Sequence, residues 1–242
     1  MTEADFLRCY DPREFTPLAV TADLLVMAAG LTGIQLALLR RTEHPQRGRW
    51  SLPGGFVHED EDLTETPRRV LREKVGFGGD VAIEQLATFG ACDRDPRMRI
   101  ITVAHLVLLP EAGFATMLER QPGLVAATLD VAPDGRVRVL SPERRPLRLA
   151  FDHAEIVSLG IERLRGKLDW SDLPFRLLPP EFTLRALQQV YETVLGRAIN
   201  KPSFRKRMLD RGHLEATGRR DEGSGFRPAE LYRFIGMKEL AA

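Results

Sequence analysis

Cysteine is scarce in this chain, and long hydrophobic runs are too. The 242 residues include two cysteines, Cys9 and Cys92. Two cysteines cannot make a disulfide framework or, by themselves, a zinc site. We therefore expect both to be reduced packing residues of a cytoplasmic protein.

The aliphatic segments of the chain are too short to span a membrane. The longest one, residues 100–109, is interrupted by Thr102 and His105. A spanning helix needs about 20 apolar residues, so this segment predicts a buried strand instead. Residues 1–5 are acidic and lack the apolar core of a secretory signal. We expect no membrane partner.

Charge is nearly balanced overall but unevenly distributed. The chain has 35 Lys and Arg against 34 Asp and Glu, and its hydrophobic fraction of 43% is ordinary for a soluble protein. Residues 181–242 carry 12 Lys and Arg against 8 Asp and Glu, a net of +4, whereas residues 1–180 have a net of −3. A basic C-terminal module on a mildly acidic body indicates that the small part meets a polyanion.

The segment from residue 54 to residue 77 carries the most specific motif. Gly55, Glu61, Arg69, Gly76 and Phe77 have the spacing of the Nudix box, GX5EX7REUXEEXGU, in which U is a bulky aliphatic residue. The segment therefore resembles this pyrophosphate-handling motif. A chance glycine-rich turn before a charged helix is the alternative interpretation.

Two positions depart from the motif in a way that affects its chemistry. Val70 stands where the motif has Glu after its Arg, and Lys74 stands where it has the second Glu of its pair. Positions 70, 73 and 74 share one face of a helix. In the Nudix family this face holds Mg²⁺, a hard cation that prefers carboxylate oxygens, and here it keeps only Glu73. We expect no metal site and no catalytic residue, and a scaffold kept for binding.

Strand-like and helical patterns alternate along the first 168 residues. Because proline fits only the first turn of a helix, Pro67 predicts that the box helix covers residues 66–75. We expect a second helix over 152–164, despite Gly160, and a helical turn over 114–118. Apolar runs predict strands over 18–27, 34–39, 100–109, 136–140 and 148–151. With the Nudix resemblance, these elements imply an α/β fold, a mixed sheet sandwiched by helices.

A proline-rich segment follows. Residues 169–180 contain Pro174, Pro179 and Pro180, which block regular helix. We place a linker over 169–180, between a Nudix-like effector-binding domain over 1–168 and a DNA-binding domain over 181–242.

The last part of the chain predicts helix, turn, basic helix and hairpin. Thr183 is expected to cap a helix that Gly196 ends, and Asn200 a second helix that Gly212 ends. The expected inward positions are Leu184, Leu187, Tyr191, Val194 and Leu195 on the first helix and Phe204, Met208 and Leu209 on the second. Strand-like residues 213–217 and 231–234 bracket a polar loop. This is the pattern of a winged helix-turn-helix domain.

The second of these helices is the candidate DNA reader. Between residues 197 and 211 there are six basic residues and one acidic residue, Asp210. An exposed basic face can enter the major groove and bond to guanine edges or phosphates. The predicted DNA-binding residues are Lys201, Ser203, Arg205, Lys206 and Arg207 on the helix, and Arg219, Arg220 and Arg227 in the wing. A merely solvated helix and a protein-docking winged helix are the alternatives.

The candidate effector site lies around the box. Glycines at 54 and 55 let the backbone approach a ligand closely, and arginine offers phosphate a planar fork of donors. The predicted effector-binding residues are Arg40, Arg49, Trp50, Gly54, Gly55, Glu61, Glu73 and Lys74. Solvated strand ends would carry the same arginines. Three histidines, His58, His105 and His153, lack the spacing of metal ligands, and we expect each to be structural or solvent-facing.

The combination of a damaged Nudix box and a C-terminal winged helix resembles the NrtR family, the Nudix-related transcriptional regulators of NAD metabolism. The resemblance also rests on residues 93–97 before a buried strand, on 182–185 and 204–207 in the two C-terminal helices, and on 227–234 in the wing. Met98 and His105 depart from the more usual Gly and Tyr of the family.

The family resemblance implies a homodimer that binds a palindromic double-stranded operator and represses NAD biosynthesis or salvage genes. It also implies sensing of ADP-ribose or a related NAD metabolite, with no required cofactor. The rival interpretation is an active Mg²⁺-dependent pyrophosphatase of ADP-ribose or nucleoside diphosphates with a docking module. In that case Glu59, Glu61 and Glu73, together with substrate phosphates, would hold one Mg²⁺.

Overall fold

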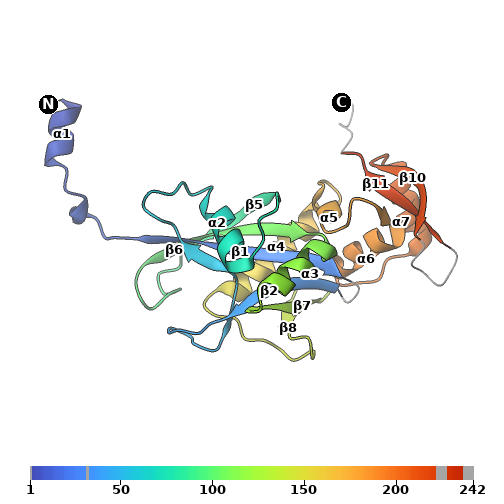
Figure 1. The fold of residues 1–242 in the computed structure, drawn as a ribbon, viewed down its shortest axis with the longest axis horizontal. Helices are drawn as coiled ribbons and strands as arrows, with labels where there is room; N and C mark the ends of the chain where they lie inside the picture. The colour runs from blue at the N-terminus through green and yellow to red at the C-terminus, as the bar shows by residue number, and fades with distance from the viewer. Residues whose placement is uncertain (1, 31–32, 222–227, 237–242) are drawn as a thin grey trace.

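A mixed sheet of eight strands forms the larger part of the molecule (Figure 1). The computed structural model describes residues 2–30, 33–221 and 228–236. The sheet order is β5-β6-β1-β2-β7-β8, with β3 paired to β2 and β4 paired to β1. The strands are β1 (Ala19–Gly30), β2 (Gly33–Arg40), β3 (Trp50–Ser51), β4 (Gly54–Phe56), β5 (Ile83–Phe89), β6 (Ile100–Leu109), β7 (Leu124–Val131) and β8 (Val137–Leu140).

Strand β1 lies inside this sheet because it is apolar on both sides. It pairs in parallel with β6 and antiparallel with β2 and β4. Successive side chains of a strand point to opposite faces. Leu25 and Met27 therefore pack into one buried cluster, and Leu24 and Val26 pack into another. Burial on both faces explains the near-continuous apolar sequences of β1 and β6.

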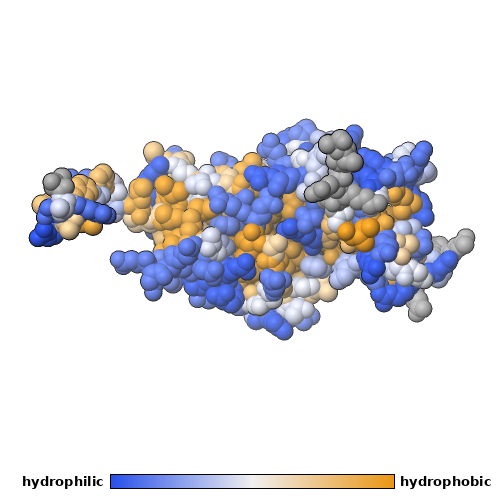
Figure 2. Space-filling model, turned by 90° about the horizontal axis from the view of Figure 1, so that it is seen from above, coloured by the Kyte–Doolittle hydropathy of each residue, from blue (hydrophilic) through white to orange (hydrophobic). Residues whose placement is uncertain are grey.

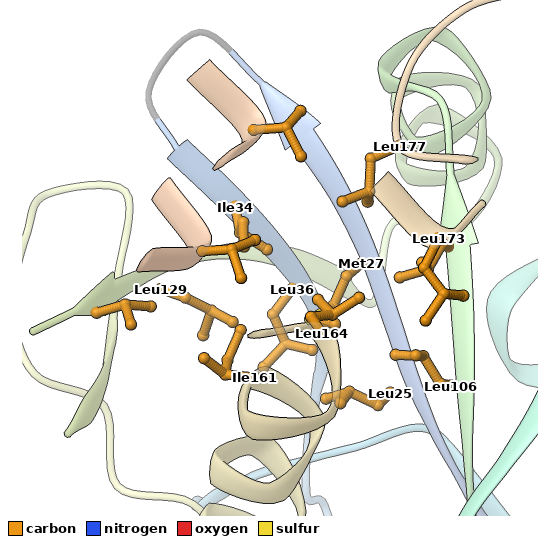
Figure 3. Close-up of a cluster of buried hydrophobic side chains, with 14 of the residues drawn as sticks. Leu25, Met27, Ile34, Leu36, Leu106, Leu129, Ile161, Leu164, Leu173 and Leu177 are labelled. Atoms are coloured by element: carbon orange, nitrogen blue, oxygen red, sulfur yellow. The ribbon is translucent and has the colours of Figure 1, made fainter. Parts of the chain in front are cut away.

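Helices cover both faces of the sheet. On one side, α2 (Thr66–Val75) and α3 (Glu111–Arg120) pack against the cluster that contains Leu24. On the other side, α4 (His153–Lys167) contributes Ile161 and Leu164, which lie over Leu25 and Leu36 (Figure 3). This sheet between helices confirms the predicted fold class.

The box helix has the bounds that the sequence predicts. Helix α2 begins at Thr66 with Pro67 in its first turn, and it ends at Val75. Gly76 follows in the left-handed conformation, with a φ of 72°, and its N–H faces the carbonyls of Leu71 and Arg72.

An N-terminal arm precedes β1. Helix α1 (Glu3–Cys9) and the 3-10 turn Pro12–Glu14 bury no residue, and α1 stands apart from the sheet in Figure 1. Phe6, Tyr10 and Phe15 lie ring against ring, with centroids 5.7 and 6.1 Å apart. They are 48%, 48% and 61% exposed. The arm thus presents an apolar surface that the rest of the described chain does not cover.

The C-terminal part is a small three-stranded sheet with helices, in the order β10-β11-β9. Its elements are α5 (Leu173–Arg176), β9 (Phe182–Thr183), α6 (Leu184–Leu195), α7 (Lys201–Asp210), β10 (Leu214–Asp221) and β11 (Ala229–Phe234). Two helices joined by a turn and followed by a hairpin make a winged helix. The predicted winged helix-turn-helix is confirmed.

The two predicted caps of the C-terminal helices are present. The Oγ1 atom of Thr183 accepts the N–H of Ala186 at 3.1 Å, and the Oδ1 atom of Asn200 accepts the N–H of Ser203 at 3.1 Å. One inward prediction was wrong, because Leu209 is 39% exposed. Phe204 and Met208, four residues apart, occupy the inner face of α7.

Residues 169–180 contain more structure than the sequence predicts. Pro174 lies in the first turn of α5, where the missing N–H of proline costs no helical bond. Leu173, Leu177 and Leu178 are buried in the cluster that also contains Leu187 of α6. The expectation that prolines exclude helix here was wrong for α5. The boundaries at 168 and 181 stay a prediction.

Two further expectations about elements were wrong. Residues 148–151 form no strand: Leu149 makes an isolated bridge with Trp50, and Phe151 has a φ of 50°. The turn expected at 114–118 is the longer helix α3. Strands β5 and β7 were missed, because β5 lies at the sheet edge with polar outer positions and β7 is rich in small residues.

Among the residues that the structure describes, no helix combines the length and the apolar character that a membrane span requires.

Candidate functional site

A polar cleft opens where β4 joins β1, and its volume is about 440 Å³. Its wall contains five cationic residues, three carboxylates and a histidine, which come from β1, the end of β2, the β2–β3 connection, α2, the loop before β6 and the start of α4. They are Arg40, Arg41, Lys74, Arg94, Arg97, Asp23, Glu43, Asp95 and His153. A cleft of this size with a surplus of cations suits an anion of nucleotide size.

The floor of the cleft is a network of buried charges. Asp23 of β1 accepts a hydrogen bond from the Thr102 hydroxyl of β6 at 2.7 Å. The guanidinium of Arg94 lies 3.7 Å from Asp23 and donates two bonds, each of 2.7 Å, to the carboxylate of Asp152. Buried charges persist only when they are paired. Arg94 thereby ties the loop before β6 to β1 and to the first turn of α4.

Gly54 allows two strands to meet above this floor. It pairs with Asp23 across the β1–β4 ladder. A Cβ atom added at Gly54 would lie 2.1 Å from Oδ1 of Asp23. A side chain there would displace the carboxylate, so the glycine is required by close approach of the backbone.

His153 is a structural member of the wall. Its Nδ1 atom accepts the backbone N–H of Leu52 at 2.9 Å, which places the ring proton on Nε2, 3.8 Å from Asp23. Burial lowers the pKa of His153, and Asp23 opposes this shift. Burial also lowers the pKa of His105 on β6. Both histidines are therefore neutral in the folded protein at pH 7.

Two cation–aromatic pairs line the cleft. The Arg41 guanidinium lies 4.8 Å from the centroid of the Phe151 ring, and that of Arg97 lies 5.7 Å from Phe56. Arg97 also pairs with Asp95 at 2.8 Å. Burial and the charge of Arg97 lower the pKa of Arg41. An anion between the two guanidinium groups would relieve their repulsion.

The carboxylates of the box are held by Arg69 of α2. Its Nε and NH2 atoms donate to Glu61 at 2.8 and 2.9 Å, and the Thr66 hydroxyl donates to the same carboxylate at 2.9 Å. The hydrogen bond from Arg69 holds the pKa of Glu61 at about 2. Arg69 also donates to Glu73 at 3.3 Å and to the carbonyl of Phe56 at 2.7 Å. These bonds fasten the box loop to α2.

A second surface lies on α7, in the C-terminal part of the chain. A shallow groove of about 460 Å³ runs along this helix and is lined by Ser203, Lys206, Arg207, Asp210 and Arg211. All five residues predicted on α7 are exposed. The helix therefore presents a basic outer face, with Asp210 as its acidic member.

Aromatic rings and one ion pair hold the basic side chains of α7. The Arg207 guanidinium lies 5.8 Å from the ring centroid of Tyr191 and 5.6 Å from that of Phe204. Arg205 donates to the Tyr232 hydroxyl at 3.4 Å. At the end of the helix, Arg211 pairs with Asp169 at 2.9 Å. Side chains that are preorganised in this way lose less entropy on binding a polyanion.

The predicted wing residues differ in their surroundings. Arg219 of β10 forms an ion pair with Glu181. Arg220, on the same strand, is exposed. The third predicted residue, Arg227, lies outside the described residues.

Comparison with known proteins assigns the two parts of the chain to known domain types. Residues 18–128 match the model of the NUDIX domain. Residues 174–234 match the model of the NrtR DNA-binding winged helix domain.

One relative spans nearly the whole chain. It is the "ADPR responsive transcriptional repressor NtrR" of Acinetobacter baylyi, which is 33% identical over 235 residues, 96% of this chain and 88% of that protein. The chain belongs to the NrtR family. Shewanella oneidensis NrtR, crystallised with a 27mer DNA, is 31% identical with a TM-score of 0.72, over 89% of this chain and 93% of that one. A MutT/nudix family protein from Enterococcus faecalis shares the fold, with a TM-score of 0.73 and 24% identity over 98% and 94% of the two chains.

In this NrtR-family chain, half of the predicted effector residues line the cleft. Arg40, Gly54, Gly55 and Lys74 lie in its wall. The structure places the other four, Arg49, Trp50, Glu61 and Glu73, outside the wall. Trp50 packs against the core, and the two glutamates bond to Arg69.

Sequence reasoning missed several wall residues of this NrtR-family cleft. Arg94, Asp95 and Arg97 belong to the loop that carries part of the family resemblance, and that resemblance was the available signal. Phe151 and His153 gave no local signal, because they are about 100 positions from Leu52 in the sequence and long-range contacts, among them the bond between His153 and Leu52, bring them to the cleft.

Proposed function

We propose that this protein is a repressor of NAD biosynthesis or salvage genes that binds a palindromic operator as a homodimer and responds to ADP-ribose. The A. baylyi relative is named as an ADPR-responsive repressor, and S. oneidensis NrtR was crystallised with DNA. The observation that carries the proposal is a cation-rich cleft joined through one continuous core to a winged helix with a basic outer face.

Helix α7 is proposed as the DNA reader. Ser203, Lys206 and Arg207 lie along its exposed groove, where they can reach base edges or phosphates in a major groove. Lys201 and Arg205 flank them, and Arg219 and Arg220 can contact the neighbouring backbone. The contacts to phosphate make the affinity fall steeply with salt.

ADP-ribose is the effector that the cleft supports best. Its pyrophosphate carries two negative charges, which Arg41, Lys74 and Arg97 can balance without a metal. The rings of Phe56 and Phe151 line the cleft and offer faces for a base or ribose. No further cofactor is needed for binding in this proposal.

A homodimer is supported by the N-terminal arm. A helix as short as α1 is not stable in water without a packing partner. Figure 2 shows apolar surface both on the arm and on the adjacent end of the sheet. Leu18, Phe56 and Met98, exposed by 54%, 43% and 45%, are exposed apolar residues of the sheet domain. A second copy of the chain would cover such surfaces.

Catalytic hydrolysis is not part of the proposed function, because the Mg²⁺ implied by the Nudix fold does not fit this donor set. Val70 is fully buried and apolar, and Lys74 places an ammonium in the cleft wall. Glu61 already accepts bonds from Arg69 and Thr66. Among the described residues, no group of three or more His, Cys, Asp or Glu is placed to share a metal.

Two binding measurements test the proposal. ADP-ribose is titrated into the protein by calorimetry, and a duplex selected by the protein from a randomised library is titrated with and without ADP-ribose. We expect saturable binding of both, with a DNA affinity that changes when ADP-ribose is present. Failure to bind either one would refute the proposal.

The hydrolase alternative is tested separately by incubating the protein with ADP-ribose and Mg²⁺ and measuring AMP and ribose 5-phosphate, the two products of pyrophosphate hydrolysis, by chromatography. We expect turnover far below the usual enzyme range of about 1–10³ per second, and the same rate in Mg²⁺ and in EDTA. Mg²⁺-dependent turnover within that range would establish the hydrolase instead.

A further inference from the structure

Helix α4 contacts both the cleft and the winged helix, and it is the long helix between them. At its start, Asp152 receives the two 2.7 Å bonds from Arg94. The next residue, His153, lines the cleft and accepts the N–H of Leu52. Any ligand that competes for Arg94 or displaces His153 acts directly on the first turn of α4.

At its other end, α4 holds the end of α6 through Arg165. The Nε atom of Arg165 donates to the carbonyl of Val194 at 2.7 Å, and NH2 donates to Leu195 at 3.0 Å and to Ala132 at 2.7 Å. The last carbonyls of a helix lack partners within the helix and carry partial negative charge. One guanidinium therefore satisfies two such carbonyls of α6 and fixes them to the residue that directly follows β7.

Three further contacts continue from α4 to the DNA-binding helix. The Tyr191 hydroxyl of α6 donates to the carbonyl of Leu168, directly after α4, at 2.5 Å. The Tyr191 ring meets Phe204 of α7 edge to face, with centroids 5.1 Å apart. Arg211, which caps α7, pairs with Asp169 at 2.9 Å. The end of α4 thus fixes both helices of the winged helix-turn-helix.

Between its two ends, α4 is closely packed against the sheet. Ile156, Ile161 and Leu164 are at most 1% exposed. A Cβ atom added at Gly160 would lie 2.0 Å from Cδ2 of Leu25, so the helix lies directly on β1 at that point (Figure 3). A close-packed helix transmits a displacement of one end to the other as a rigid body.

We propose that α4 is the element that couples occupancy of the cleft to the position of α7, and that Arg165 is the positioning residue that attaches the winged helix to it. The inference rests on the proposed function and specifies how it is regulated. A phosphate in the cleft competes with Asp152 for the donors of Arg94, which changes the anchoring of the first turn of α4. Arg165 and the end of α4 pass this shift to α6 and α7.

Arg165→Ala tests the proposal, and Arg163→Ala is the matched control. Arg163 is on the same helix and also bonds a backbone carbonyl, that of Leu86, together with Glu84, but both partners belong to β5. The measured quantity is the ratio of the two ADP-ribose Kd values obtained with and without the library-selected duplex, the larger divided by the smaller. Allosteric ratios are commonly about 5–150-fold. We expect R163A to keep the wild-type ratio and R165A to bring it below about a third of that value, at unchanged ADP-ribose affinity without DNA.

Other outcomes separate this inference from the proposed function. A wild-type ratio of one would refute the ADP-ribose response itself and the coupling with it. A wild-type ratio above one that R165A preserves would refute only the role of α4 and Arg165. If R165A fails to fold by circular dichroism, Arg165→Lys replaces it. Lysine keeps the charge but cannot bond three carbonyls with a planar fork, so we expect the ratio to fall there too, and an unchanged ratio would overturn the proposal.

Discussion

At the scale of single residues, Lys74 best illustrates how the box has changed its chemistry. The motif places a carboxylate at this position, and the chain places an ammonium in the wall of the cleft. A cation at the end of α2 also sits favourably beside the negative end of the helix dipole. An anionic ligand can therefore meet a positive charge where the hydrolases of the fold use a metal.

We expect Lys74→Gln to raise the Kd for ADP-ribose about tenfold, which corresponds to about 1.4 kcal/mol for one lost charge-assisted contact. Calorimetric titration measures this change. The matched control is Arg72→Gln, because Arg72 is an exposed cation on the same helix and does not line the cleft. An equal loss in both variants would point to general electrostatic attraction rather than to a contact with Lys74.

The two buried histidines predict a loss of stability in mild acid. Burial lowers the pKa values of His105 and His153 below the usual 6.5. Below about pH 6.5 the unfolded chain binds protons that the folded chain does not bind. The stabilisation is therefore complete above that pH and decreases as the pH falls through it, by up to about 1.4 kcal/mol per pH unit for each histidine.

Thermal unfolding between pH 7.5 and 5.5 checks this dependence. We expect Tm to fall over this range in the wild type and to fall less in His153→Gln, because glutamine can accept the N–H of Leu52 but does not titrate. A Tm that is constant or rises on acidification would show that these histidines are not held neutral by the fold.

At the scale of elements, α7 combines a buried inner face with a basic outer face. Phe204 and Met208 fix it against α6, and its cations lie on the groove side. Arg207 belongs partly to both faces, because its guanidinium lies over two aromatic rings. Removing Arg207 therefore alters packing as well as charge, and Lys206 gives the cleaner test of DNA contact.

We expect Lys206→Ala to weaken binding to the selected duplex by about 1–3 kcal/mol if it meets a base edge. If Lys206 meets a phosphate, the loss should be similar for all sequences, and the salt slope should shrink by about one. Fluorescence anisotropy at several salt concentrations distinguishes the two cases. Arg185→Ala on the exposed side of α6 is the control. If K206A and R185A behave alike, α7 is not the reader.

At the scale of the whole molecule, one core joins the Nudix domain and the winged helix. Leu25 of β1, Leu164 of α4, Leu187 of α6 and Phe204 of α7 belong to the same buried cluster. Close-packed cores respond to a local change by shifting whole elements. The winged helix is thus fixed to the sheet by packing rather than tethered by a flexible linker.

The N-terminal arm gives a test of assembly. We expect the triple variant Phe6→Ser, Tyr10→Ser and Phe15→Ser to convert the proposed homodimer into a monomer, because it removes the aromatic surface that a second copy would cover. Sedimentation equilibrium measures the mass. Trp170→Ser, which changes a side chain that is 76% exposed outside the arm, should leave the dimer intact. A wild-type monomer, or a triple variant that remains a dimer, would contradict the expectation.

The sequence by itself determined the elements whose signals are local. Pro67 and Gly76 fixed α2, and Thr183 and Asn200 fixed the starts of α6 and α7. These are capping and proline effects, which depend on neighbours within a few residues. The spacing of the box and the basic residues of α7 likewise gave the family and its two surfaces before any contact was known.

The tertiary structure alone decided which side chains meet. Glu61 and Glu73 are near Lys74 in sequence, yet both pair with Arg69 and neither lines the cleft. Arg94 and His153 are far from the box, yet Asp23 and Leu52 bring them to it. A buried charge is stable only beside groups that pair with it. Such groups can come from any part of the chain. For this reason the motif and four residues of the wall could be found in the sequence, whereas the rest of the wall could not be found without the tertiary structure.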